Sequence, residues 1–309
     1  MKINIISRDN LAGLSAGTEI LTGIFRNQGW QVDFNDYKSL KRFSFWNYRH
    51  YDLNLFIQWA NPTWMRLARA NILIPNPEWF KEKWMRNLSR FDRIFCKTRQ
   101  ARAIFSAYNP HAVFTSFTSR NKHLEIKKNH DQWLHLPGKS KLKGTEIIID
   151  TWLKNPHFPH LTIVQRNAPN HVGLKAGNLT YISEYVSDSE AQRLMNTCAV
   201  HLCPSSAEGF GHYIGEALSC GALIISTGGA PMNELVSEER GVLIQPVREE
   251  KMRLSQAYFI DPQGLEKAVQ EVMEMSQEHR EMLMKNARDF YMENDRYFRE
   301  TLVEEIKKL

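Results

Sequence analysis

The stretch CPSSAEGFGHYIGEALSCGALIISTGGAPMNELV, residues 203–236, carries a strand end, a glycine-rich loop and the start of a helix. An apolar run ends at Cys203, small residues follow, and we predict a helix from His212–Tyr213. Gly209 and Gly211 let the loop backbone come close to a ligand. Because a helix amino end offers unpaired N–H groups and the positive end of its dipole, the stretch predicts an anion site at the carboxyl edge of a parallel sheet.

Two glutamates lie within this stretch, Glu208 in the loop and Glu216 one turn into the predicted helix. Such spacing arises often by chance, and a glycine-rich turn with two surface glutamates would show it too. The flanking residues add context: PSS precedes the loop, EGFG begins with Glu208, and TGGAPMNE follows the next strand. The whole stretch resembles the donor-binding signature of retaining GT-B glycosyltransferases of the family four type, the group 1 glycosyltransferases.

The resemblance implies roles for individual residues. Glu208 would be catalytic and would bind hydroxyls of the donor sugar, and Glu216 would bind the ribose hydroxyls of the nucleotide. The donor-binding residues of the same stretch would be Gly209, Phe210, Gly211 and His212. The implied fold is an α/β fold of GT-B type, with two doubly wound Rossmann-like domains facing a central cleft.

Short apolar runs alternate with amphipathic stretches in two series, residues 2–115 and residues 133–244. Strand-length runs separated by helical patterns are typical of parallel sheets covered on both faces. We therefore predict an acceptor-side domain over residues 1–128 and a donor-binding domain over residues 129–293. Residues 294–309 are expected to form a helix that packs back on the first domain.

Three helix boundaries are expected from the same patterns. The first helix should begin at Thr18 after a loop, and another should span residues 79–88. After Pro262 the pattern is helical almost to the end, with a break near residues 293–295.

A second element that resembles the family is His135–Thr145, HLPGKSKLKGT. A strand is expected to end at Gly138, and lysines fill the loop before the next helix. In the family an Arg and a Lys at this place neutralise the diphosphate of the sugar nucleotide. Lys143 matches the Lys position, and Lys139 takes the Arg position with a spacing one residue shorter and without a bidentate fork. Solvated loop lysines would fit the same pattern.

Between these elements, Leu179–Leu194 resembles the strand and loop that hold the nucleotide base. Tyr181 and Ile182 could pack on a base, and Ser187–Glu190 is typical of a helix start. Tyr181 could equally belong to the hydrophobic core.

The first loop, within Ile5–Gly17 (IISRDNLAGLSAG), lacks the Gly-x-Gly-x-x-Gly fingerprint, which disfavours dinucleotide binding. In the family, glycines of this loop approach the donor phosphates, and Gly13 or Gly17 would suit that role. An ordinary glycine-rich turn would have the same sequence.

The acceptor side is represented by PNPEW, residues 75–79, which follows a predicted strand. Asn76 and Glu78 could meet the acceptor, although a capped helix start explains the same residues. The basic histidine found on this side in many relatives has no counterpart here.

Charge is divided unevenly along the chain. Residues 1–128 carry 21 Lys and Arg against nine Asp and Glu, within a chain total of +6. Lys81–Arg102 is especially basic, with Trp79, Phe80 and Trp84 interleaved at its start. Such a face could lie on anionic lipid, could follow a nucleic-acid backbone, or could be a solvated helix whose aromatic residues are core.

The resemblance implies a retaining hexosyltransferase of class EC 2.4, which moves a sugar from a nucleotide-diphosphate sugar to an acceptor hydroxyl. No Asp-x-Asp motif occurs, so we expect no divalent metal and no cofactor apart from the donor substrate. The expected acceptor is a glycan or lipid-linked saccharide. Alternatives are transfer to modified bases of DNA and a non-catalytic protein that binds a nucleotide sugar or nucleic acid.

We expect a cytoplasmic location, with peripheral contact to the inner membrane face, because the chain begins without a signal peptide pattern and has no apolar run long enough to cross a bilayer. The cysteines include no Cys-x-x-Cys pair, and Cys198, His201 and Cys203 form the one cluster that suggests a metal. Strand alternation is expected to place Cys198 and Leu202 on one face and His201 and Cys203 on the other, which argues against it.

Overall fold

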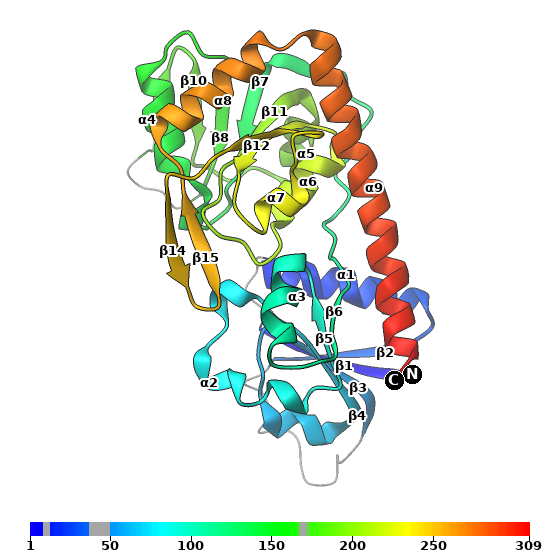
Figure 1. The fold of residues 1–309 in the computed structure, drawn as a ribbon. Helices are drawn as coiled ribbons and strands as arrows, with labels where there is room; N and C mark the ends of the chain where they lie inside the picture. Colours follow the sequence, from blue (N-terminus) through cyan, green and yellow to red (C-terminus); the bar gives the residue numbers. More distant parts are fainter. Residues whose placement is uncertain (9–12, 37–49, 167–170, 172) are drawn as a thin grey trace. The chain divides into compact units, whose positions relative to one another are not determined.

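The computed structural model describes residues 1–8, 13–36, 50–166, 171 and 173–309 (Figure 1). These residues form two compact units. Unit 1 comprises Met1–Ser119, Lys251–Ser255 and Asn294–Leu309, and unit 2 comprises Arg120–Glu250 and Gln256–Glu293. The boundary expected after residue 128 therefore falls inside unit 2.

Unit 1 is built on a parallel sheet whose described strands follow the order β2-β1-β3-β4-β5-β6. Its strands are β1 (Lys2–Ser7), β2 (Gln31–Asp36), β3 (Tyr51–Ile57), β4 (Ala68–Ile74), β5 (Arg93–Cys96) and β6 (Ala112–Phe114). Its helices and 3₁₀ turns are α1 (Gly13–Asn27), η3 (Pro62–Leu67), η4 (Pro77–Trp79), α2 (Glu82–Met85), η5 (Leu88–Arg90) and α3 (Arg99–Ser106). Helix α1 contacts β1 and β2, and α3 contacts β5 and β6. The predicted parallel α/β architecture is confirmed in this half.

An asparagine ladder crosses the middle of this sheet. Asn35 Nδ2 donates to Asn4 Oδ1 at 2.8 Å, and Asn4 Nδ2 donates to Asn54 Oδ1 at 2.9 Å. Asn54 Nδ2 then donates to Asn71 Oδ1 at 2.9 Å. Each bond joins neighbouring strands, so buried amides that would be costly alone satisfy one another.

Unit 2 is built on a larger sheet of order β13-β12-β11-β7-β8-β10-β9, in which the β9–β10 pairing is antiparallel and the others are parallel. Its strands are β7 (Asn129–His135), β8 (His160–Val164), β9 (Lys175–Ala176), β10 (Leu179–Ile182), β11 (Cys198–Cys203), β12 (Leu223–Thr227) and β13 (Val242–Ile244). Its helices are α4 (Thr145–Lys154), α5 (Asp188–Thr197), α6 (His212–Ser219), α7 (Met232–Leu235) and α8 (Pro262–Glu274), and a 3₁₀ turn, η6 (Lys141–Lys143), precedes α4.

Both faces of the unit 2 sheet are covered by apolar side chains. Trp133 packs in one cluster with Trp152 and Leu161, whereas the next residue, Leu134, packs in another with Met195 and Cys198. Successive strand residues point to opposite faces, so a strand buried on both sides reads as a continuous apolar run.

Three expectations about helices are wrong. Helix α1 spans Gly13–Asn27 and thus includes residues before the expected start at Thr18, with Gly17 already buried. The expected helix over residues 79–88 is replaced by two 3₁₀ turns and the short α2. The expected break near residues 293–295 is absent, since α9 (Gln277–Lys307) is one helix of 31 residues.

A strand pair without counterpart in the expectations, β14 (Arg248–Met252) and β15 (Ser255–Phe259), forms a two-stranded sheet. Its turn residues, Lys251–Ser255, group with unit 1. The backbone N–H of Leu254 donates to the Pro77 carbonyl at 3.3 Å.

Candidate active site

The candidate site lies where the chain direction changes in the unit 2 sheet. Strands β7 and β11 are neighbours, but the chain leaves β7 through α4 to β8 on one side and leaves β11 through α6 to β12 on the other. In open α/β sheets, ligands bind outside the carboxyl ends of strands at this kind of switch point. The loops after β7 and β11 therefore bound the expected place for a ligand.

Backbone contacts fix these two loops to each other. Gly144 has φ +72°, and a Cβ there would lie 2.7 Å from the Pro204 carbonyl oxygen. The N–H of Ser206 donates to the Leu142 carbonyl at 2.8 Å. Only glycine combines this left-handed conformation with so close an approach.

Lys143 and Glu208 meet across the two loops. Lys143 Nζ donates to Glu208 Oε1, and each side chain is 12% exposed. Ser205 Oγ donates to the same carboxylate oxygen at 2.6 Å and also hydrogen-bonds the Tyr213 hydroxyl. The Lys143 ammonium lies 3.7 Å from the centroid of the Tyr213 ring. Glu208 is therefore no surface glutamate, and Lys143 is no solvated loop lysine.

Two helix amino ends beside this pair have no side-chain cap. Helix α4 follows Gly144 and α6 follows Gly211, and both glycines have left-handed backbones. By contrast, Ser187 caps α5 and Asp261 caps α8 through side-chain hydrogen bonds. Uncapped N–H groups at a helix amino end are suited to an anion, which the macrodipole also favours.

A buried histidine that the sequence analysis did not single out as a site residue supports the β7 loop. His135 Nδ1 is 2.8 Å from the Leu202 carbonyl oxygen, which can only accept, so Nδ1 carries the proton. Nε2 then accepts from the Thr145 hydroxyl at 3.0 Å, at the first residue of α4. Burial lowers the pKa of His135 to about 4, so the ring stays neutral near pH 7. His135 thus ties β7 to β11 and to the start of α4.

Glu216 lies in the second turn of α6 and is half-buried. Burial raises its pKa, while the positive charges of Lys122, Arg120 and Lys143 lower it. The carboxylate therefore lies among cations on the same side of unit 2 as Lys143.

The residues expected around the nucleotide base fall into the interior. Tyr181 is 4% exposed and belongs to the main apolar cluster of unit 2, and its hydroxyl donates to Gln165 Oε1 at 3.0 Å. Ile182 is half-buried, and Phe210 is buried with its ring centroid 5.7 Å from that of His212. Of these residues, the side chains of Ile182 and His212 are partly exposed.

The expected phosphate-side glycines lie within a helix, and Lys139 lies in the predicted loop without a contact to the Lys143–Glu208 pair. Lys139 is exposed in the turn after Gly138, and no hydrogen bond or ion pair joins it to another described residue. Strand β7 ends at His135, three residues before the expected end at Gly138. Gly13 is the first residue of α1 and Gly17 is buried within that helix, so neither lies in a free loop. Residues 9–12 of the first loop lie outside the described residues.

In unit 1, the acceptor-side candidates surround a buried lysine that the sequence analysis did not single out. Lys97 Nζ donates to Asn76 Oδ1 at 2.7 Å and lies 5.0 Å from the centroid of the Phe117 ring. Glu78 is 3% exposed. Burial lowers the pKa of Lys97 to about 8, and the Glu78 carboxylate opposes that shift. These residues follow β4 and β5 at the carboxyl edge of the unit 1 sheet.

The basic stretch Lys81–Arg102 does not form one helical face. Phe80, Trp84 and Leu88 are buried in the core of unit 1, as the alternative interpretation required, whereas Trp79 is 48% exposed. Lys97 is buried. The described helices include none long and apolar enough to cross a membrane.

The expected strand alternation around Cys198 is wrong. The β7–β11 register shifts between Cys198 and Val200, so Cys198 packs with Met195 whereas Leu202 packs in the opposite cluster. His201 Nε2 donates to the Met195 carbonyl at 3.0 Å, and burial lowers its pKa to about 3. Among described residues, no three His, Cys, Asp or Glu side chains group as metal ligands.

Comparison with known proteins gives a family match and fold matches. Residues 173–290, which contain Glu208 and Glu216, match the family described as glycosyl transferases group 1. No curated protein sequence matches the chain.

Solved structures with the same fold cover the entire chain. HepE from Anabaena, in complex with UDP and glucose, is 15% identical with a TM-score of 0.71 and full coverage of both chains. Sucrose-phosphate synthase from Thermosynechococcus elongatus is 13% identical with a TM-score of 0.76, covering 100% of this chain and 98% of that one. An E. coli structure described as trehalose-6-phosphate bound with UDP-2-fluoro glucose is 12% identical, with a TM-score of 0.70 and coverage of 100% and 99%.

The sequence match covers residues 173–290, whereas the fold matches cover the whole chain. The chain therefore has the GT-B fold, and its residues 173–290 are similar in sequence to the group 1 glycosyl transferases.

Proposed function

We propose that the chain is a retaining glycosyltransferase that moves a sugar from a nucleotide-diphosphate sugar to an acceptor hydroxyl. The observation that carries the proposal is the Lys143–Glu208 pair, held between the uncapped amino ends of α4 and α6. The group 1 family match over the same region supports it.

The diphosphate would bind at the phosphate side of this site. Breaking the sugar–phosphate bond leaves negative charge on the diphosphate, and stabilising that charge is the main demand of the reaction. Lys143 and the first N–H groups of α4 and α6 are suited to that demand. Lys139 is exposed and lies four residues before Lys143 in the sequence. Its flexible side chain would contact the same anion. These cations would replace a divalent metal.

The donor sugar would bind at Glu208. Lys143 and Ser205 both donate to Oε1, so neither of these bonds engages Oε2, which is left to accept from sugar hydroxyls. Glu216 would accept from the ribose hydroxyls. The group of Gly209, Phe210, Gly211 and His212 would border the sugar, Ile182 would lie beside the base, and Tyr181 would support that wall from the core.

Retention would follow if the acceptor attacks the anomeric carbon on the same face from which the leaving group departs. The bond between the anomeric carbon and the phosphate oxygen breaks, the acceptor oxygen bonds to the same carbon, and the acceptor proton passes to the departing phosphate. No pair of carboxylates acting as in a glycosidase is then required.

The acceptor would be a glycan or lipid-linked saccharide. Asn76, Glu78 and Lys97 place amide, carboxylate and ammonium groups together at the carboxyl edge of the unit 1 sheet. That combination of donors and acceptors is suited to hydroxyl-rich molecules.

Hydrolysis of a panel of nucleotide sugars, with and without a chelator, tests the proposal. At least one donor should be turned over equally in both conditions, and the released sugar should first appear with the donor's anomeric configuration by NMR. Glu208→Gln should abolish turnover. Glu125→Gln, whose parent side chain is 96% exposed, is the matched control and should keep it. Turnover retained in Glu208→Gln would show that the site is misplaced, and inversion would refute retention.

A further inference from the structure

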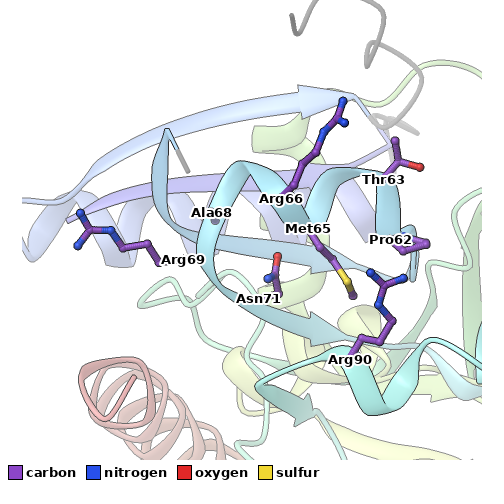
Figure 2. Close-up of a pocket in the computed structure, with 8 residues that line it drawn as sticks. All are labelled: Pro62, Thr63, Met65, Arg66, Ala68, Arg69, Asn71 and Arg90. Atoms are coloured by element: carbon purple, nitrogen blue, oxygen red, sulfur yellow. The ribbon is translucent and has the colours of Figure 1, made fainter. Parts of the chain in front are cut away.

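An open hollow of about 490 Å³ lies in unit 1, away from the residues discussed above (Figure 2). It is lined by Pro62, Thr63, Met65, Arg66, Ala68, Arg69, Asn71 and Arg90. Strand β4 begins at Ala68, so the hollow lies toward the amino ends of the strands. Substrates in this fold class bind at the opposite, carboxyl ends, where Asn76 and Lys97 are found.

The floor of the hollow carries an oriented amide. Asn71 is 8% exposed and is the last member of the asparagine ladder. Its Oδ1 accepts from Asn54 Nδ2, which fixes the amide so that Nδ2 remains as the donor. No hydrogen bond to another described residue uses this Nδ2. A nine-tenths buried amide therefore offers two N–H groups at the floor of the hollow.

Three arginines line the hollow together with this amide. They come from three separate elements, Arg66 from η3, Arg69 from β4 and Arg90 from η5. In Figure 2, Asn71 lies between Arg69 and Arg90, and Arg66 extends toward Thr63. All three are exposed. The guanidinium groups are thus spread around the rim and do not converge on one point.

Among the described residues that line the hollow, no carboxylate accompanies Arg69 and Arg90. Asp92 Oδ2 accepts from the backbone N–H of Asn71 at 2.8 Å. Within the described part of the chain, no ion pair joins Asp92 to Arg69 or Arg90. Met65, Ala68 and Pro62 add apolar surface beside the charged groups.

We propose that this hollow is a second anion site, which binds phosphate esters through Asn71, Arg69 and Arg90, with Arg66 at its rim. Guanidinium groups bind phosphate oxygens in pairs, and an amide N–H₂ adds donors of fixed direction. Because the arginines are spread apart, they favour ligands with more than one phosphate group, such as a diphosphate or the head groups of an anionic lipid surface. The volume of about 490 Å³ accommodates a phosphate with an attached organic group.

Titration calorimetry with pyrophosphate and sedimentation with phosphatidic acid vesicles distinguish the two sources of phosphate. Hydrogen–deuterium exchange of peptides covering residues 62–71 locates the bound ion, which separates this site from the donor site in unit 2. The variant Arg69→Gln/Arg90→Gln should weaken binding at these peptides by about tenfold or more, because two charge-assisted donors are lost. The matched control Arg26→Gln/Arg102→Gln removes the same charge from exposed positions outside the hollow and should bind as wild type.

Loss of pyrophosphate binding confined to Arg69→Gln/Arg90→Gln supports the site with a soluble phosphate ester as ligand. Loss of vesicle binding alone supports it with a lipid head group as ligand. Equal losses in the two double variants, or no protection of residues 62–71 by either probe, overturn the proposal. A second variant, Asn71→Asp, keeps the acceptor for Asn54 and replaces the donor by an anion, so it should also abolish binding. Nucleotide-sugar hydrolysis, measured on the same samples, should be unchanged in both double variants and reports separately on the donor site.

Discussion

Replacing Gly144 by alanine tests whether the two loops of the donor site form one rigid piece. The substitution places a Cβ 2.7 Å from the Pro204 carbonyl oxygen and 3.1 Å from Pro204 Cγ. It also forces alanine into the left-handed conformation at φ +72°. Gly138→Ala is the matched control, since Gly138 has φ +63° and a Cβ there would meet nothing within 4 Å.

The two variants should differ by the cost of the clash. The left-handed conformation costs about 1–2 kcal/mol for alanine at either position. Forcing the Cβ against Pro204 should add about 1–3 kcal/mol at position 144 alone, as in an overpacked core. Relief of the clash must shift the loop that carries Lys143 or the loop that carries Glu208, because Lys143 directly precedes Gly144 and Glu208 lies four residues after Pro204.

Urea unfolding and nucleotide-sugar hydrolysis measure the two consequences. Gly144→Ala should lower the free energy of unfolding by more than Gly138→Ala and should reduce turnover well below it. If both variants lose the same stability and keep the same turnover, the contact with Pro204 does not position the site, and the reasoning fails.

Further predictions concern groups held by burial. Lys143→Met should lower the free energy of unfolding by about 3 kcal/mol, because it leaves the Glu208 carboxylate buried without its cation. The control Lys127→Met, at an exposed lysine, should not lower it. Equal losses of the two variants in urea unfolding would contradict this prediction. The pKa of Lys97 is lowered from 10.5 to about 8, so between these pH values the unfolded chain binds more protons than the folded one. The free energy of unfolding should therefore rise with pH in this range. This rise should be absent from Lys97→Met. The pKa of His135 is lowered to about 4, so stability should fall as pH drops from about 6.5 toward 4, and the slope should be smaller in His135→Gln. Tyr213→Phe keeps the ring beside Lys143 and removes the bond to Ser205, so a loss of about 1 kcal/mol is expected in thermal unfolding, and a loss above about 3 kcal/mol would show a larger role for the hydroxyl.

Much of the fold follows from the pattern of apolar residues. Strands buried on both faces, such as β12, begin as continuous apolar runs between helical patterns, and this made the two parallel sheets predictable. The loop with Glu208 and the start of α6 were equally accessible, because glycine spacing and helix periodicity are local properties of the chain.

The failures arise where distant contacts decide the local structure. Asn294 and Asp295 look like a helix break, but Ser116 donates to the Asn294 side chain at 2.5 Å and Thr118 donates to Asp295 at 2.8 Å. These bonds give the two polar side chains partners outside the helix. Without such partners, Asn and Asp are unfavourable inside a helix because they compete for its backbone hydrogen bonds. The pair β14–β15 was missed for a similar reason, since its first strand, REEKM, is charged and mostly exposed and has no apolar alternation.

The site itself was predicted only in part for the same physical reason. Glu208 and Lys143 come from loops 65 residues apart, and their meeting depends on β7 and β11 being neighbours. His135 and Lys97 carry no sequence signal, because a buried histidine or lysine is recognisable only from its surroundings. Tyr181 shows the converse, since an aromatic residue suited to a base is also suited to a core.

The membership of residues 294–309 in unit 1 has a consequence for the order in which the protein is made. Phe298, Leu302 and Ile306 of this segment are buried, and the Phe298 ring lies 4.7 Å from that of Phe117. A ribosome releases residues 1–119 long before these partners exist, whereas every residue of unit 2 has been synthesised by Glu293. The amino-terminal half of the protein therefore completes its core only after the carboxyl-terminal segment has been made.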